Sequence, residues 1–160
     1  MNKFKNLIVL RTFSKAFGVP SIRAGYTISC KENMKILSKA RIAHELSSVS
    51  VAIAEYLIDN YEVVKKNVAK IKFSRKLLKK KLEKLGLENR SQYGNYILIK
   101  FQNSKEATKV VKFLKKKFIY VKGPYQKPWD SFINISIGPF SIMRPFLTGL
   151  KEAKRKKLFL

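Results

Sequence analysis

The longest regular pattern in the sequence is a run of apolar residues at helical spacing between Tyr61 and Leu85. The apolar positions are separated by lysines and form one stripe, made of Val64, Val68, Ile71, Leu78, Leu82 and Leu85. This spacing predicts one long amphipathic helix whose lysine-rich side faces water. Gly86 is predicted to end the helix, because glycine readily takes the left-handed conformation found after a helix C-terminus.

The residues before this helix predict two strands followed by two shorter helices. The expected strands cover residues 6–11 and 24–29, and the expected helices cover residues 30–43 and 49–58. Ser47 and Ser48 are N-cap candidates for the second of these helices. His44 is the only histidine of the chain. One histidine cannot build a metal site, so we assign it no role and expect no bound metal.

The residues after the long helix alternate between strand and helix patterns. The predicted strands cover residues 95–101, 118–122 and 132–137, and the predicted helices cover residues 104–117 and a segment with Pro145 in its first turn that ends near Lys157. Ser104 is the expected cap of the first of these helices. The alternation indicates an α/β fold in which strands pack under helices on one face.

The polar turn after the first strand places a lysine in a setting that suits carbonyl chemistry. Lys15 should lie just beyond the end of a buried strand, between the hydroxyls of Thr12 and Ser14 and the guanidinium of Arg23. A lysine amine forms Schiff bases with aldehydes, and the planar fork of an arginine matches a phosphate. The residues therefore indicate a lysine that binds an aldehyde bearing a phosphate. The simpler alternative is a chance lysine in a strand–turn segment.

The run TFSKAFGVPSIRAGY resembles the pyridoxal-phosphate lysine signature of class I/II aminotransferases, and it is most similar to the histidinol-phosphate aminotransferase branch. The resemblance continues through SQYGNYILIKF, KFIYVKGPY and FINISIGP, in the order of the C-terminal part of that family. It implies the C-terminal part of a transferase of fold type I that depends on pyridoxal phosphate. Residues 1–60 would be a remnant of the large cofactor-binding domain, and residues 61–160 the small C-terminal α/β domain that begins with the interdomain helix.

The resemblance also implies roles for individual residues. Lys15 matches the catalytic lysine that binds pyridoxal 5'-phosphate, Arg23 matches the arginine that holds the phosphate, and Thr12 and Ser14 match hydroxyls that accompany it.

On the substrate side the sequence departs from the family. Asn134 stands where the family has an arginine for the substrate carboxylate, and Lys122 stands where the branch carries a second arginine. An amide supplies neither the charge nor the fork, whereas the lysine keeps the charge alone.

The same comparison implies that much of the cofactor site is encoded outside this chain. The family's aspartate at the pyridine nitrogen, the tyrosine and asparagine at O3′ and the glycine-rich phosphate loop would precede Met1. We therefore expect a fragment, a split gene product or a truncated reading frame, which is inactive alone. The alternative is a non-catalytic basic remnant or an anion- or nucleic-acid-binding protein.

The charge balance is strongly basic, with 35 lysines and arginines, 10 aspartates and glutamates and a formal net charge of +25. The sequence contains no nucleic-acid recognition module, so we expect no nucleic-acid partner. We expect no membrane span, because charged residues interrupt every apolar run, and a cytoplasmic location, because Cys30 is the only cysteine and no leader pattern is present. The family implies a homodimer acting on an amino acid and a 2-oxo acid or phosphorylated substrate.

Overall fold

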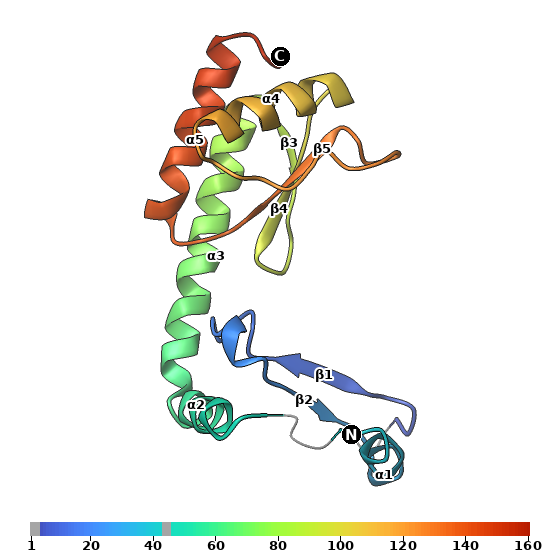
Figure 1. Cartoon of the computed structure of the whole chain (residues 1–160). Coiled ribbons are helices and arrows are strands. Elements are labelled where there is room, and N and C mark those ends of the chain that lie inside the picture. Colours follow the sequence, from blue (N-terminus) through green and yellow to red (C-terminus); the bar gives the residue numbers. More distant parts are fainter. Residues whose placement is uncertain (1–3, 43–45) are drawn as a thin grey trace. The chain divides into compact units, whose positions relative to one another are not determined.

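The structure is a computed structural model that describes residues 4–42 and 46–160 and divides into two compact units (Figure 1). The first unit ends at Val68 and the second runs from Ala69 to Leu160. Helix α3 (Tyr61–Glu83) contains this division, so it contributes residues to both units. The predicted domain boundary between residues 60 and 61 coincides with the start of α3, and as a boundary between functional domains it stays a prediction.

The first unit is built on a ribbon of two antiparallel strands. Strand β1 (Val9–Thr12) pairs with β2 (Gly25–Ile28), and Thr12 lies opposite Gly25. Both predicted strands are present, each shorter than expected. A Cβ atom at Gly25 would lie 2.7 Å from the carbonyl oxygen of Arg11, so this position requires glycine for close strand approach.

The prediction that the first strand is buried is wrong. Three of the four residues of β1 are exposed, and the side chain of Leu10 is 76% exposed. The reason is that the ribbon has only two strands among the described residues, and its surroundings leave the Leu10 side chain largely uncovered. The core of the first unit lies instead at the end of the ribbon, where Phe13, Ile22 and Ala24 are buried.

Two helices follow the ribbon. Helix α1 (Lys31–Ser38) is shorter than the predicted 30–43, of which residue 43 lies outside the described residues. None of its residues is buried and its apolar Ile36 is 67% exposed, and a short helix that buries little is not extended by spacing alone. Helix α2 (Ser48–Asp59) confirms its predicted cap, because the Ser47 hydroxyl accepts a hydrogen bond from the Ser50 backbone at 3.1 Å.

Helix α3 ends as the sequence predicts. Gly86 has a φ of +78°, and the backbone N–H of Leu87 donates to the carbonyl of Leu82 at 3.0 Å. The same carbonyl also accepts from the backbone N–H of Leu85 at 2.9 Å, so residues beyond the last turn supply the hydrogen bonds at the end of the helix.

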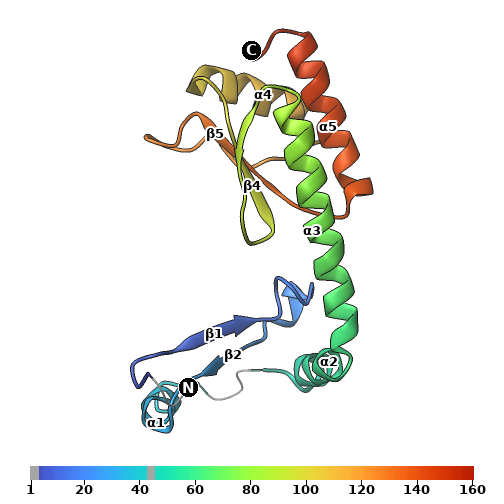
Figure 2. The same ribbon diagram turned by 180° about the vertical axis from the view of Figure 1, so that it is seen from behind.

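The second unit is a three-stranded antiparallel sheet covered by helices on one face (Figures 1 and 2). Its strands are β3 (Glu88–Arg90), β4 (Tyr96–Lys100) and β5 (Phe132–Ser136), in that spatial order, and its helices after α3 are α4 (Ser104–Lys116) and α5 (Phe140–Arg155). Ile97 and Ile99 lie opposite Ile135 and Ile133, and all four side chains are buried against the helices. Alternate residues of each strand therefore form a second face outside this core.

One predicted strand of the sheet is wrong, and one observed strand was not predicted. The predicted strand 118–122 is absent except for one bridge, between Lys122 and Asn134. Phe118 has a φ of +60° and Ile119 donates its backbone N–H to Leu114, so these residues close the end of α4 instead. Strand β3 completes the sheet. The sequence pattern does not predict this strand, because its residues are polar.

The starts of the last two helices also differ from the prediction. The cap of α4 is Asn103, whose side chain accepts a hydrogen bond from Glu106 at 3.0 Å, and Ser104 is already helical. Helix α5 begins at Phe140, so Pro145 lies inside the helix and not in its first turn. The buried side chain of Met143 explains the earlier start, because core packing outweighs the usual position of proline.

Candidate functional site

The turn that carries Lys15 is closed by backbone hydrogen bonds at both ends. Phe13 donates its backbone N–H to Ala24 at 3.2 Å, which extends the ribbon by one residue beyond β1. Val19 donates to the carbonyl of Phe13 at 3.2 Å, and Gly18 donates to the carbonyl of Lys15 at 3.1 Å. Lys15 thus lies at the tip of a closed loop, directly after the strand as predicted.

Aromatic side chains anchor this loop to the rest of the first unit. The ring of Phe13 is 3% exposed and its centroid lies 4.5 Å from that of Phe17. Phe17 in turn lies 6.0 Å from Tyr61 of α3, and Asn67 of the same helix donates a hydrogen bond to the carbonyl of Ala16 at 3.3 Å. These contacts fix the positions of the residues on either side of Lys15. The Lys15 side chain itself is exposed.

The two predicted hydroxyl residues form a local contact beside Lys15. The Thr12 hydroxyl oxygen accepts a hydrogen bond from the backbone N–H of Ser14 at 3.1 Å. This contact fixes the backbone between the strand and Lys15. The structure thus joins Thr12 and Ser14 directly.

Arg23 stands at the other end of the loop in a strained backbone conformation. It follows the short helix η1 (Pro20–Ile22) with a φ of +53°, which non-glycine residues adopt rarely. Its backbone N–H and one guanidinium nitrogen, Nη1, both donate to the carbonyl of Pro20, at 3.4 and 2.9 Å. Among the described residues no carboxylate pairs with this guanidinium, so its remaining donors are available to an anion.

These four residues suit a ligand that has an aldehyde and a phosphate. The exposed amine of Lys15 can add to a carbonyl carbon, and the guanidinium of Arg23 can donate to phosphate oxygens together with the hydroxyls. The donor set therefore fits pyridoxal phosphate. The structure gives no contact between Lys15 and Arg23 themselves.

The two predicted substrate residues lie in the second unit and are directly paired in one antiparallel β-bridge. Lys122 and Asn134 exchange two backbone hydrogen bonds, of 2.9 and 2.7 Å. Directly paired residues project from the same face of a sheet, and here it is the face opposite the buried isoleucines. The structure thus brings a lysine cation and an amide together, although the strand predicted to carry Lys122 is absent.

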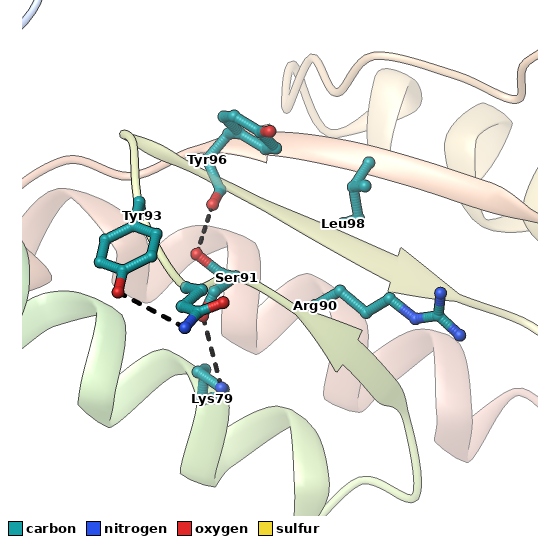
Figure 3. Close-up of a pocket in the computed structure, with 7 residues that line it drawn as sticks. Lys79, Arg90, Ser91, Tyr93, Tyr96 and Leu98 are labelled. Carbon is teal, nitrogen blue, oxygen red and sulfur yellow. Dashed lines mark hydrogen bonds between the residues drawn. The ribbon is translucent and has the colours of Figure 1, made fainter.

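A hollow of about 540 Å³ beside the β3–β4 hairpin contains polar residues that the sequence pattern did not single out (Figure 3). Lys79 of α3 is half-buried and donates to the carbonyl of Ser91 at 3.4 Å, and the Ser91 hydroxyl donates to the carbonyl of Tyr96 at 2.6 Å. Arg75 also donates to the hairpin, at the carbonyls of Gln92 and Gly94. These α3 cations hold the turn of the hairpin, so Lys79 is an exception to the solvated lysine face.

Arg90, which also lines the hollow, is paired with a carboxylate. Its Nε and Nη2 atoms donate to one oxygen of Glu88 at 3.1 and 3.0 Å, and Lys100 lies 3.2 Å from the other oxygen. The hydrogen bonds from Arg90 and from Lys100 hold the pKa of Glu88 below its usual range. The cations of Arg90 and Lys100 thus share one counter-ion.

Neither a metal cluster nor a membrane span is found in residues 4–42 and 46–160. In those ranges no cluster of three or more histidine, cysteine, aspartate or glutamate side chains could hold a metal ion. No helix in the same ranges is long and apolar enough to cross a membrane. His44 lies outside the described residues.

The fold and the Lys15 loop together resemble one part of the enzymes of a class that binds pyridoxal phosphate. Residues 1–139 match the family "Aminotransferase class I and II", and the chain belongs to this family. It is similar to the histidinol-phosphate aminotransferase of Caldicellulosiruptor saccharolyticus, with 32% identity over 95% of the chain and 42% of the relative. It is 36% identical to that of Buchnera aphidicola subsp. Cinara cedri, over 98% of the chain and 45% of the relative.

Solved structures give the same result for the fold. The histidinol-phosphate aminotransferase of Sinorhizobium meliloti, in complex with pyridoxal-5'-phosphate, matches with a TM-score of 0.85 and 27% identity over 95% of this chain and 42% of that one. The histidinol-phosphate aminotransferase of Clostridium acetobutylicum matches in fold, with a TM-score of 0.86 and 22% identity over 97% of this chain and 48% of that one. The predicted α/β fold, as part of fold type I, and the resemblance to this branch are confirmed. The chain spans about two fifths of the length of the curated relatives.

Proposed function

We propose that this chain contributes the cofactor lysine and the phosphate-binding arginine of an aminotransferase that resembles histidinol-phosphate aminotransferase. The observation that carries the proposal is the Lys15 loop, closed by backbone hydrogen bonds and anchored by Phe13, in a chain that belongs to the aminotransferase family. Pyridoxal phosphate, when bound, supplies the electron sink for the bonds at the substrate Cα atom.

Each residue of the loop has a separate task in this proposal. Lys15 Nζ would hold the cofactor at its aldehyde carbon, with release of water, and would carry the proton at the substrate Cα atom. Arg23 holds the phosphate with the guanidinium donors that Pro20 does not use, and Thr12 and Ser14 add hydroxyl donors. The closed loop keeps these groups in place before the ligand arrives.

The substrate residues are proposed to be Lys122 and Asn134. The lysine offers a charge to the carboxylate or phosphate of an amino acid, a 2-oxo acid or a phosphorylated carbonyl compound, and the amide offers one donor beside it. In an assembled enzyme, Asn134→Arg should tighten amino-acid binding, because a bidentate ion pair replaces a neutral contact. An unchanged apparent affinity would show that the carboxylate binds elsewhere.

The chain alone is proposed to be inactive, because it spans about two fifths of the length of its relatives. A catalytic site needs supporting residues to hold its geometry, and a homodimer that includes the remaining length is the expected complete form. A half-reaction assay of the chain alone, with several amino acids and saturating pyridoxal phosphate, should give only the rate of the free cofactor. Turnover above that rate would contradict this part of the proposal.

The decisive experiment is to trap the cofactor on the protein. Borohydride reduction of the chain with pyridoxal phosphate, followed by peptide mass spectrometry, should place the label on Lys15. Lys15→Arg should remove that label, the matched variant Lys66→Arg should keep it, and Arg23→Gln should raise the cofactor concentration required. A label spread evenly over the many lysines would show that Lys15 is not a cofactor site.

A second candidate is a non-catalytic anion-binding protein, and the net charge of +25 favours it. It predicts binding of single-stranded RNA that weakens steeply with salt and is unaffected by Lys15→Arg. Selective labelling of Lys15 without RNA binding at physiological salt would exclude this candidate. The cytoplasmic location stays a prediction from the sequence.

A further inference from the structure

The hollow beside the β3–β4 hairpin has cations and aromatic rings in its wall (Figure 3). Its volume of about 540 Å³ lies within the range of pockets that hold small molecules. Lys79 and Arg90 are its cations, Tyr93 and Tyr96 carry its rings, and none of the residues that line it is an aspartate or a glutamate. None of the residues proposed above for the cofactor or the substrate lines it either, so the hollow is a site of its own.

Hydrogen bonds hold the wall of the hollow in place. The Ser91 hydroxyl donates to the carbonyl of Tyr96 at 2.6 Å and so joins the two sides of the hairpin. Arg75 of α3 donates to the carbonyls of Gln92 and Gly94 in the turn. A ligand binds more tightly to a wall that is already fixed, because less conformational freedom is lost on binding.

Both cations of the hollow keep hydrogen-bond donors for a ligand. Figure 3 shows Lys79 reaching from α3 toward the hairpin. Its Nζ atom donates to the carbonyl of Ser91 at 3.4 Å, which is a long bond and occupies one of three ammonium donors. Arg90 uses Nε and Nη2 for Glu88, and this leaves Nη1 to another acceptor. An anion in the hollow can therefore accept hydrogen bonds from both side chains.

The charges around the hollow indicate what kind of anion fits. Lys79, Arg90 and Lys100 are positive, and Glu88 is the carboxylate that Arg90 and Lys100 share. The excess of two positive charges matches a phosphate monoester, which carries about −1.5 to −2 charges at pH 7. A phosphodiester carries one negative charge and matches this excess less well.

The two tyrosines offer flat surfaces to the rest of the ligand. Tyr93 is 78% exposed and Tyr96 is 44% exposed. The Tyr96 ring lies beside Gly94, where a Cβ atom would come within 3.3 Å of it, and half-buried Leu98 adds an apolar side chain to the wall. Exposed aromatic rings of this kind stack on planar heterocycles.

We propose that the hollow binds a small ligand that combines a planar ring with a phosphate monoester, which is the chemistry of a nucleoside monophosphate. The ring stacks on Tyr93 and Tyr96, and the phosphate accepts hydrogen bonds from the remaining donors of Lys79 and Arg90. The site shares no residue with the Lys15 loop and its ligand needs no aldehyde, so this inference does not rest on the proposed function.

Isothermal titration calorimetry of the whole 160-residue chain tests the site. The probe is adenosine 5'-monophosphate at physiological ionic strength, without pyridoxal phosphate. One equivalent should bind, about tenfold or more tightly than either inorganic phosphate or adenosine. Lys79→Gln and Arg90→Gln should each weaken binding about 10- to 100-fold, because each removes a hydrogen bond to a charged group.

Substitutions at Tyr93 test the contribution of the ring. Tyr93→Ala should weaken binding of adenosine 5'-monophosphate about 5- to 100-fold, because the stacking surface is lost. Tyr93→Phe keeps the ring and should bind as the wild-type chain does. Equal affinities of the two variants, or of inorganic phosphate and adenosine 5'-monophosphate, would overturn the proposal because the ring would then have no part in binding.

Controls separate the hollow from other sources of affinity. Lys81→Gln removes an exposed lysine from the same helix and should leave the dissociation constant unchanged. Equal weakening by Lys79→Gln and Lys81→Gln would show that net charge alone attracts the probe, and would overturn the site. Weakening by Arg23→Gln but not by Lys79→Gln would place the nucleotide at the Lys15 loop and would also overturn it.

Two further outcomes distinguish this proposal from the others. Tighter binding of an oligoadenylate without a terminal phosphate than of adenosine 5'-monophosphate would assign the hollow to single-stranded nucleic acid and overturn the proposal. Lys15→Arg should leave nucleotide binding unchanged. A chain that binds the nucleotide but shows no selective labelling of Lys15 would therefore support the hollow and contradict only the proposed function.

Discussion

Replacing Phe13 by alanine is the sharpest test of how the Lys15 loop is held. The Phe13 ring is 3% exposed and packs against Phe17 and Tyr26, with ring centroids 4.5 and 6.0 Å away. A buried Phe→Ala change costs about 3–5 kcal/mol, from lost transfer free energy and the cavity that remains. Among the described residues, the buried cluster that contains Phe13 has Ile22 and Ala24 as its other buried members, so little else in that cluster can compensate.

The expected result is a local opening of the loop. The backbone N–H of Val19 donates to the carbonyl of Phe13 and is therefore a direct reporter of loop closure. In native-state hydrogen exchange, Phe13→Ala should accelerate exchange of the Val19 amide by up to about two to three and a half orders of magnitude, at about 1.4 kcal/mol per tenfold. Amides of strand β4 in the second unit should keep their protection, and labelling of Lys15 by pyridoxal phosphate and borohydride should fall.

The control is Phe118→Ala, which removes a ring that is 83% exposed and should change neither measurement. A change below about 1 kcal/mol for Phe13→Ala would refute the reasoning, since that is the scale of a surface substitution and not of a buried ring. If the amides of β4 exchanged faster to the same extent as the Val19 amide, the expectation that Phe13→Ala opens only the first unit would be wrong.

Three further predictions concern the second unit. Gly123 has a φ of +123° and a Cβ atom there would lie 2.8 Å from a backbone oxygen of β5, so Gly123→Ala should lower the free energy of unfolding by about 1–3 kcal/mol in urea denaturation. Asn103→Ala should cost about 1 kcal/mol by the same measurement because it removes the cap of α4, and a similar cost for Ser104→Ala would show that the cap is misassigned. The hydrogen bond and ion pair with Lys117 lower the pKa of Glu152. The stabilising contribution of Glu152 should therefore be fully present at pH values above the pKa that its carboxyl has in the unfolded chain, and it should be lost as pH falls through the lower pKa of the folded state. Glu152→Gln should remove that part of the pH dependence of the free energy of unfolding. An NMR titration that finds the Glu152 pKa at or above its ordinary value would contradict this.

The sequence determined the features that depend on local chemistry. The long stripe of apolar residues and the glycine at position 86 defined α3 and its end, because helical spacing and a positive φ are properties of neighbouring residues. The strands β4 and β5 were also predicted, since their runs of β-branched and aromatic residues are a local property of the chain. The position of Lys15 directly after a strand also followed from the pattern, since an apolar run and a polar turn are adjacent in the chain.

Only the tertiary structure decided which segments that are distant in sequence pair with each other. It made β3 from polar residues, because the edge of β4 offers backbone partners that local propensity does not show, and it left residues 118–121 outside the sheet because they close α4. It also placed Lys122 opposite Asn134 and fixed the Lys15 loop through Asn67, contacts that join residues far apart in sequence. The exposure of Leu10 was not predictable from its apolar strand, because burial depends on whether another layer covers that face, and no described residue of this chain does so.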